Sequence, residues 1–173
     1  MDAHTTFDPG HFRRVLSHFA SGVVIVTGVV DGDPAGLTCQ SFTSLSLNPP
    51  MVLFCPSKTS TSWPLLATAP CLCVNVLSAG QHQLSDAFAR SGSDKFAGVA
   101  WSPTPRGAPA LDGAAAHIEA RIAARHDGGD HHIVTCVVEA LSAESDPDPL
   151  LYYRSGYRAL DHPDHSGRQR QVA

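Results

Sequence analysis

The sequence has few charged residues and no long apolar run, and each shortage excludes a class of protein. Asp, Glu, Lys and Arg make up 16% of the 173 residues and hydrophobic residues 43%, the opposite of the balance that keeps a chain disordered. The formal net charge of −4 gives no basic footprint for nucleic acid. No apolar run approaches the ~20 residues that span a bilayer. We therefore predict one globular domain that binds neither nucleic acid nor membrane.

The N-terminal segment and the cysteines favour a cytoplasmic location. The first ten residues contain no basic segment followed by an apolar run, so we expect no signal peptide. The five cysteines are odd in number and scattered, whereas secreted domains carry an even, framework-like set. The close pair Cys71 and Cys73 and the ten histidines lack the spacing typical of zinc sites. We therefore predict a reducing compartment and no metal.

Hydrophobic periodicity predicts many strands and few helices. Asp8-Pro9 is a typical helix start, and an apolar stripe at helical spacing, Phe12, Val15, Leu16 and Phe19, follows it and ends near Gly22. Strands are predicted over residues 23–27, 36–47, 51–55, 71–77, 114–124, 131–142 and 150–154, and short helices over 60–67 and 81–90. The Asp-Gly-Gly-Asp segment at 127–130 predicts a hairpin. The fold class is mainly β, an antiparallel barrel of Greek-key type with a few peripheral helices. Its domain covers residues 8–160, and residues 161–173 form a polar tail.

Three polar segments are candidate ligand sites. Residues 38–46 are rich in hydroxyl groups beside a buried strand, which suits either a ligand site or a half-exposed strand. Residues 57–62 place Lys58 among five hydroxyl residues at a predicted helix start, a composition that suits phosphate; a capped surface loop is the alternative. Residues 88–96 combine cationic and aromatic side chains, and this loop by itself indicates little.

Taken together, these segments resemble a known family, the short-chain flavin reductases, which are the reductase components of two-component flavin-dependent monooxygenases. The resemblance covers residues 12–160. It rests on the order and spacing of Gly36-Leu37-Thr38, residues 41–50, Asp94-Lys95-Phe96, Gly129-Asp130-His131, and residues 150–154 with Gly156-Tyr157. It implies an FMN-binding split barrel, a homodimer, that oxidises NADH or NADPH. Reduced FMN or FAD would then pass to a partner monooxygenase.

The resemblance also implies the roles of individual residues. The isoalloxazine ring would contact Thr38, Cys39, Gln40, Ser41, Ser44 and Leu45. The ribityl chain and phosphate would contact Cys55, Ser57, Lys58, Thr59 and Ser60, and the residues closing over the flavin would be Arg90, Lys95 and Phe96. The nicotinamide would contact His131 and Tyr157. No residue is assigned as an acid or base, because hydride passes directly between the two rings.

The residues by themselves leave several alternative roles and functions open. By itself, His131 at a turn suits a structural imidazole bound to a backbone carbonyl; the resemblance assigns it to the nicotinamide instead. On the same barrel, an oxidase or a deazaflavin-dependent reductase would retain its cofactor and reduce or oxidise an organic substrate. A non-enzymatic flavin-binding module is a third interpretation. FMN and FAD, and NADH and NADPH, are equally compatible with the sequence.

Overall fold

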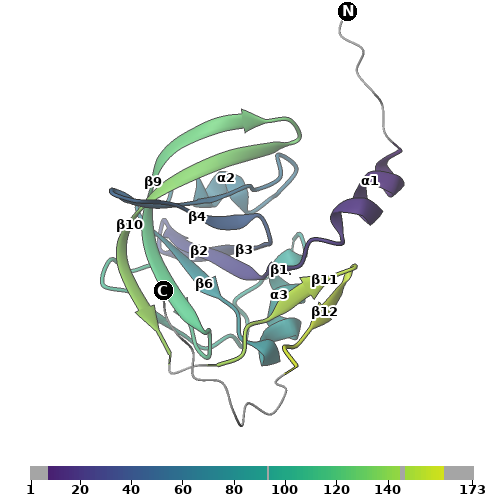
Figure 1. Ribbon diagram of the computed structural model, residues 1–173. Helices are drawn as coiled ribbons and strands as arrows, with labels where there is room; N and C mark the ends of the chain where they lie inside the picture. Colours follow the sequence, from purple (N-terminus) through teal and green to yellow (C-terminus); the bar gives the residue numbers. More distant parts are fainter. Residues whose placement is uncertain (1–7, 93, 145–146, 162–173) are drawn as a thin grey trace, which may run out of the picture.

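A seven-stranded antiparallel sheet, curled into a barrel, forms most of the molecule (Figure 1). The computed structural model describes residues 8–92, 94–144 and 147–161. The strand order is β3-β2-β6-β9-β10-β5-β4, and every pairing is antiparallel. The strands are β2 (Val24–Val30), β3 (Asp33–Cys39), β4 (Phe42–Leu47), β5 (Pro50–Phe54), β6 (Leu72–Val76), β9 (Ala116–Gly128) and β10 (His131–Ala143). The predicted mainly β, antiparallel fold is confirmed.

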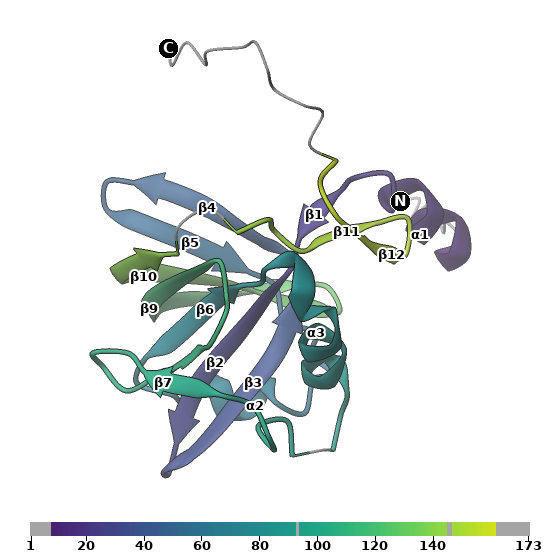
Figure 2. The ribbon, with the colours of Figure 1, turned by 90° about the horizontal axis from the view of Figure 1, so that it is seen from below.

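Short helices and two small sheets surround the barrel. β1, β11 and β12 form a three-stranded sheet beside the N-terminal helix, and β7 and β8 form a separate ribbon (Figure 2). In the described part of the chain, no helix is long and apolar enough to cross a membrane. These elements are α1 (Pro9–Leu16), β1 (Ser21–Gly22), α2 (Trp63–Leu66), η1 (Ala79–Gln81), α3 (His82–Ala89), β7 (Trp101–Pro103), β8 (Pro109–Leu111), β11 (Leu151–Tyr153) and β12 (Gly156–Arg158).

The chain crosses from one edge of the large sheet to the other between β3 and β4. These strands are consecutive in the sequence, yet they are the first and the last in the strand order. The predicted single strand over residues 36–47 is therefore wrong, because Gln40 and Ser41 form a link that divides it. Ser41 Oγ donates to the Cys55 carbonyl at 3.0 Å and accepts from the Cys55 amide at 3.1 Å. This pair of hydrogen bonds fixes the link against the end of β5.

The buried apolar residues form two main clusters, and β2 contributes to both. Val24 and Val26 point into the first cluster, which fills the barrel and contains Phe54 and Trp63 of α2. Ile25 points the other way, into a second cluster that α3 covers. A run of β-branched residues buried on both faces explains why this segment forms a central strand.

The N-terminal helix stands outside the barrel, beside the β11–β12 hairpin (Figure 1). Asp8 caps it as predicted, since its carboxylate accepts from the amides of Gly10 and His11. The predicted extent is wrong, because the helix ends at Leu16 and not near Gly22. Its apolar stripe packs on no core: Phe12 is 53% exposed and Phe19 is 82% exposed. The physical reason is that no element in the described residues covers this face.

The remaining predicted elements are confirmed with shifts of a few residues at their ends. The hairpin at residues 127–130 joins β9 and β10, which are the longest strands of the barrel. The sequence missed β1, β7, β8 and β12, each of two or three residues, because such short strands carry too little periodicity. The predicted polar tail lies outside the described residues from residue 162 onward.

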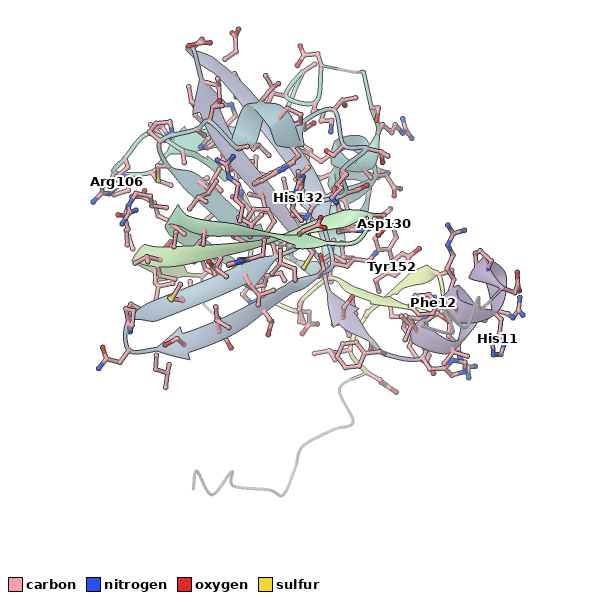
Figure 3. The ribbon with its side chains drawn as sticks, turned by 90° about the horizontal axis from the view of Figure 1, so that it is seen from above. His11, Phe12, Arg106, Asp130, His132 and Tyr152 are labelled. Carbon is pink, nitrogen blue, oxygen red and sulfur yellow. The ribbon has the colours of Figure 1, made fainter. Side chains whose placement is uncertain are left out.

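An ion cluster, buried at Glu119 and exposed at Arg106, joins β9 and β10 at the end of the hairpin that lies away from its turn. Arg106 Nε lies 3.5 Å from a Glu119 oxygen and 3.0 Å from a Glu139 oxygen. The Cys71 sulfur lies within 4.8 Å of both carboxylates, and burial, then the two glutamates, raises its pKa to about 11. Figure 3 labels Arg106 there, far from Asp130 at the hairpin turn. The positive guanidinium offsets the negative charge of both carboxylates, which would otherwise be poorly solvated and unpaired.

The packing of α3 on β3 depends on a glycine. A Cβ atom added at Gly36 would lie 2.5 Å and 2.7 Å from two ring atoms of Phe88, and Phe88 is fully buried. The ring of Phe88 therefore occupies the space that any side chain at this position would need. This contact holds the C-terminal end of α3 near the link between β3 and β4.

We expect Gly36→Ala to lower the free energy of unfolding by about 1–3 kcal/mol, because the added methyl overpacks a site with no free volume. Urea denaturation measures the change. Gly80→Ala is the matched control: Gly80 is exposed and nothing lies within 4 Å of its added Cβ, so stability there should change by less than about 0.5 kcal/mol. Equal effects of the two substitutions would contradict the packing argument.

Candidate functional site

A cavity of about 520 Å³ opens where the chain crosses between the two edges of the sheet. This volume lies within the range of roughly 300–1,000 Å³ found for small-molecule sites. Its wall combines the link between β3 and β4, the loop after β5, the end of α3 and the start of β10. The sequence-predicted residues that line it are Thr38, Cys39, Gln40, Ser41, Cys55, Ser57, Thr59, Ser60, Arg90, Lys95 and His131.

Side-chain hydrogen bonds hold the link between β3 and β4, and the end of β3, in the cavity wall. Thr38 Oγ1 donates to the Ser85 carbonyl of α3 at 2.6 Å. The Cys39 sulfur lies 3.1 Å from Ser41 Oγ, and burial raises the pKa of the Cys39 thiol. The thiol is therefore protonated at neutral pH, and this wall is polar without carrying charge.

The loop after β5 is tied to the turn of the β9–β10 hairpin. The amide of Lys58 donates to the Asp130 carbonyl at 3.0 Å, and Ser57 forms a β-bridge with His131. Ser57 Oγ and Thr59 Oγ1 lie 2.8 Å apart. The loop therefore presents neighbouring hydroxyl groups to the cavity on a backbone fixed from two sides.

Lys58 does not line the cavity. Its ammonium pairs with the carboxylate of Asp127, at the end of β9, and lowers the pKa of that carboxyl. A cap of α2 by Ser60 or Thr61, which the hydroxyl-rich loop predicts, is wrong: the N-cap residue is Ser62, whose side chain makes no capping hydrogen bond, although Ser60 Oγ accepts from the Trp63 amide at 3.2 Å. Because α2 has four residues, its dipole adds little. Phosphate recognition by this loop would therefore rest on hydroxyl groups and backbone amides, and the role of Lys58 stays a prediction.

Lys95 lines the cavity, but its ammonium already has three oxygen partners. It donates to the carbonyls of Gly36 and Phe88 at 3.1 and 2.8 Å, and to Ser62 Oγ at 2.9 Å. Burial lowers the pKa of this lysine, while the three acceptors favour its charged form. Lys95 thus joins β3, α3 and the start of α2, and it adds positive potential behind the wall.

His131 and His132 lie on opposite faces of β10, as the alternation along the strand predicts. His131 lines the cavity, and its Nδ1 lies 2.7 Å from an oxygen of Asp130, whose pKa it lowers. The His132 ring packs against Trp63, with 6.1 Å between ring centroids. The exposed Asp130 carboxylate can hold the His131 ring in one orientation toward the cavity.

Five predicted site residues lie outside the cavity lining: Ser44, Leu45, Lys58, Phe96 and Tyr157. Ser44 and Leu45 belong to the exposed edge strand β4, at a bulge, and their contacts with a flavin stay predictions. Phe96 packs edge-on against Phe88 at 5.0 Å. The Tyr157 hydroxyl donates to the Asp86 carboxylate at 2.6 Å and lies 3.0 Å from Ser85 Oγ. Burial of ring surface accounts for both aromatic placements.

Six residues that line the cavity had no predicted ligand contact: Leu37, Pro56, Thr61, Phe88, Ala89 and Ser91. Each lies within two residues of one that had, so their positions in the predicted segments are the signal that could have found them.

The titratable side chains that line the cavity carry positive charge or none. Arg90, Lys95 and His131 line it, and no carboxylate does so among the described residues. The whole chain carries a formal net charge of −4, so this arrangement is a local concentration of cations. Hydroxyl groups, backbone amides and cations fit the phosphate of a mononucleotide, and the apolar parts of the wall fit a planar ring.

An antiparallel split barrel with a cationic, hydroxyl-lined cavity at its split defines a class of cofactor-binding β proteins. Residues 16–161 match the model of the flavin reductase like domain, and the chain belongs to this family.

Relatives and solved structures agree with that assignment. The chain is 45% identical over 162 residues to the reductase subunit HsaB of a flavin-dependent monooxygenase from Rhodococcus jostii, covering 94% of this chain and 83% of HsaB. The crystal structure of a nitrilotriacetate monooxygenase component B homologue from Mycobacterium thermoresistibile matches with a TM-score of 0.86 and 44% identity, covering 94% and 92% of the two chains. The NADH:FAD oxidoreductase SgcE6 of Streptomyces globisporus matches with a TM-score of 0.84 and 35% identity, covering 94% and 100%.

Cys55 offers a direct test of the cavity. It is half-buried and lines the wall, whereas burial raises the pKa of Cys73 and Cys136 to about 12. Because the thiolate is the reactive form, we expect N-ethylmaleimide to modify Cys55 first. Saturating FMN should slow that reaction about tenfold or more by covering the wall.

Peptide mass spectrometry over time measures the modification of each cysteine. Cys73 and Cys136 are the internal controls, since neither lines the cavity and FMN should leave their slow rates unchanged. If FMN leaves the rate at Cys55 unchanged, the flavin does not bind in this cavity.

Proposed function

We propose that this protein transfers hydride from NADH or NADPH to FMN or FAD and supplies the reduced flavin to a partner monooxygenase. One observation carries the proposal: the three segments far apart in the sequence, the link at 38–41, the loop at 57–60 and His131, line one cationic cavity. The membership in the flavin reductase family supports the same activity.

Each part of the wall has a task in this reaction. The hydroxyl groups of Ser57, Thr59 and Ser60 and the guanidinium of Arg90 hold the flavin phosphate. The link from Thr38 to Ser41 meets the edge of the isoalloxazine ring, and His131 orients the nicotinamide. A bound flavin supplies the hydride acceptor, so the protein has to align the two rings and exclude water between them. An acid or base is not required.

The names of the relatives support the electron donor and the receiving enzyme. Relatives from Agrobacterium fabrum and Methylorubrum extorquens are named FMN reductase (NADH), and HsaB is named a reductase subunit of a flavin-dependent monooxygenase. We infer that this chain has the same type of donor and the same type of partner. Its open cavity suits a flavin that binds, is reduced and leaves.

The proposal includes a homodimer in the cytoplasm. The strand β4 is an edge of the large sheet, and Leu47 at its end is 95% exposed. Leu141 of β10, beyond the residues that pair with β5, is 71% exposed. A second copy that covers this edge would remove the unpaired backbone and the apolar side chains from water. All five cysteines are free thiols, which agrees with a reducing compartment.

Anaerobic mixing of the purified protein with each combination of NADH, NADPH, FMN and FAD tests the activity. We expect at least one combination to bleach the flavin absorbance with turnover well above the rate without protein. Retention of a cofactor through gel filtration, with direct reduction of an organic substrate, would indicate the oxidase or deazaflavin alternative. Tight flavin binding without oxidation of either nicotinamide would indicate a binding module and contradict the proposal.

The role of His131 is tested by His131→Ala. We expect the KM for the nicotinamide donor to rise, or the hydride-transfer rate to fall, by roughly ten- to a hundredfold, because small misplacements of the reacting atoms are costly in rate. Stopped-flow kinetics and flavin titration measure the two effects, and flavin affinity should change little. His132→Ala, on the opposite face of β10, is the control and should change neither. Loss of flavin affinity with unchanged nicotinamide kinetics would place His131 in the flavin site.

A further inference from the structure

Two cysteines, Cys39 and Cys55, line the wall of the cavity on the two sides of the split. Cys39 is the last residue of β3, and Cys55 follows directly after β5. Both are free thiols, Cys39 buried and Cys55 half-buried. No other cysteine of the described residues lines the cavity. A solute in the cavity therefore meets these two thiols and no third.

One hydroxyl group contacts both cysteines. Ser41 Oγ lies 3.1 Å from the Cys39 sulfur, and it accepts from the Cys55 amide at 3.1 Å and donates to the Cys55 carbonyl at 3.0 Å. The Cys39 sulfur is therefore no farther from the Cys55 amide nitrogen than the sum of the two 3.1 Å contacts. Burial is the main influence on the pKa of the Cys39 thiol and raises it, while the Cys55 backbone lowers this pKa and the Cys55 sulfur raises it. Both of these smaller influences require the two residues to be close neighbours.

This placement suits a disulfide, whereas the other close pair of cysteines does not. A disulfide needs Cβ atoms about 3.5–4.5 Å apart. Cys71 and Cys73 are two residues apart at the start of β6, and an extended chain holds their parallel Cβ atoms about 6.5 Å apart. Cys39 and Cys55 come from different strands, and the link after Cys39 is outside regular structure. A small shift of this link can bring the two sulfurs together without breaking a strand.

We propose that Cys39 and Cys55 form a reversible disulfide that closes the cavity to flavin. The bond would draw the link against the end of β5 and remove the space that the edge of the isoalloxazine ring needs. The oxidant is hydrogen peroxide, which forms when released reduced flavin passes two electrons and two protons to O2. This source of oxidant rests on the proposed function. Disulfides in a reducing compartment are typically transient and redox-sensing, and a cellular thiol reopens the cavity by exchange.

The oxidation takes two steps and consumes one peroxide. The Cys55 thiolate attacks one peroxide oxygen, the O–O bond breaks, and a sulfenic acid and hydroxide form. The hydroxide takes up the proton that Cys55 has lost and becomes the first water. The Cys39 sulfur then attacks the Cys55 sulfur: the S–S bond forms, the S–O bond breaks, and the leaving hydroxide takes the Cys39 proton to form the second water. Two thiols thus lose two electrons and peroxide gains them.

Treatment of the purified wild-type protein with hydrogen peroxide tests the disulfide without any flavin reduction. We expect peptide mass spectrometry to find a cross-linked peptide that joins Cys39 to Cys55. The internal controls are Cys71, Cys73 and Cys136, which should remain free thiols. FMN affinity, measured by fluorescence titration, should fall at least about tenfold and return after dithiothreitol. The absence of the cross-link, or a cross-link that leaves FMN affinity unchanged, would overturn the proposal.

Two variants test the order of the steps, each compared with its own untreated sample because both side chains line the cavity. In Cys39→Ala, the sulfenic acid on Cys55 has no partner, so dimedone should trap it in higher yield than in the wild type. In Cys55→Ala, peroxide should leave FMN affinity unchanged, because the thiol that reacts first is missing. A loss of affinity in Cys55→Ala as large as that of the wild type would show general damage by peroxide and overturn the proposal.

Aerobic turnover in the absence of a monooxygenase tests the source of the peroxide. We expect oxidation of the nicotinamide donor to slow as the cross-linked peptide accumulates, and catalase to prevent both changes. Steady turnover without the cross-link would contradict the peroxide step. If the protein reduces no flavin at all, the proposed function fails, and the treatment with added peroxide still decides whether the disulfide forms and closes the cavity.

Discussion

The crossing of the chain from β3 to β4 is the constraint on which the rest of the site depends. It joins the two outermost strands of a seven-stranded sheet through Gln40 and Ser41. Because the two strands do not pair with each other, the barrel is split there, and polar groups at the split can meet a ligand. The hydroxyl of Ser41 attaches the link to the residue after β5, since it both donates to and accepts from the backbone of Cys55. The cavity is therefore a consequence of the topology and not of one loop.

The side chains around the split divide into those that support the wall and those that can reach a ligand. Lys95 is fixed by three oxygen partners, and Lys58 is paired with Asp127. Arg90, His131 and the hydroxyl groups of the loop after β5 are placed to meet an anion. Such a site attracts and positions ligands, and no carboxylate lines it in the part of the chain that the structure describes. Hydride transfer between two bound rings requires that the rings be positioned against each other, and it requires no acid or base.

The N-terminal helix has a different relation to the fold. An amphipathic stripe normally packs on the core, yet here its apolar side chains remain more than half exposed. The helix is held instead through its C-terminal end, where the Ser17 carbonyl accepts from Arg154. Because the helix is freed from core packing, its apolar and cationic residues can line a second cavity next to the first, between the helix and the β11–β12 hairpin.

The sequence by itself determined the positions of most of the main strands, the cap at Asp8 and the opposite orientations of His131 and His132. These features depend on local periodicity and on alternation along one strand. Most residues of the candidate site could also be named, because their segments resemble those of a known family. Only the tertiary structure decided that residues 36–47 form two strands, that Tyr157 and Phe96 pack away from the cavity, and that the stripe on α1 stays exposed. These outcomes depend on contacts between segments far apart in the chain, and a local sequence pattern does not specify which distant residues a segment will contact.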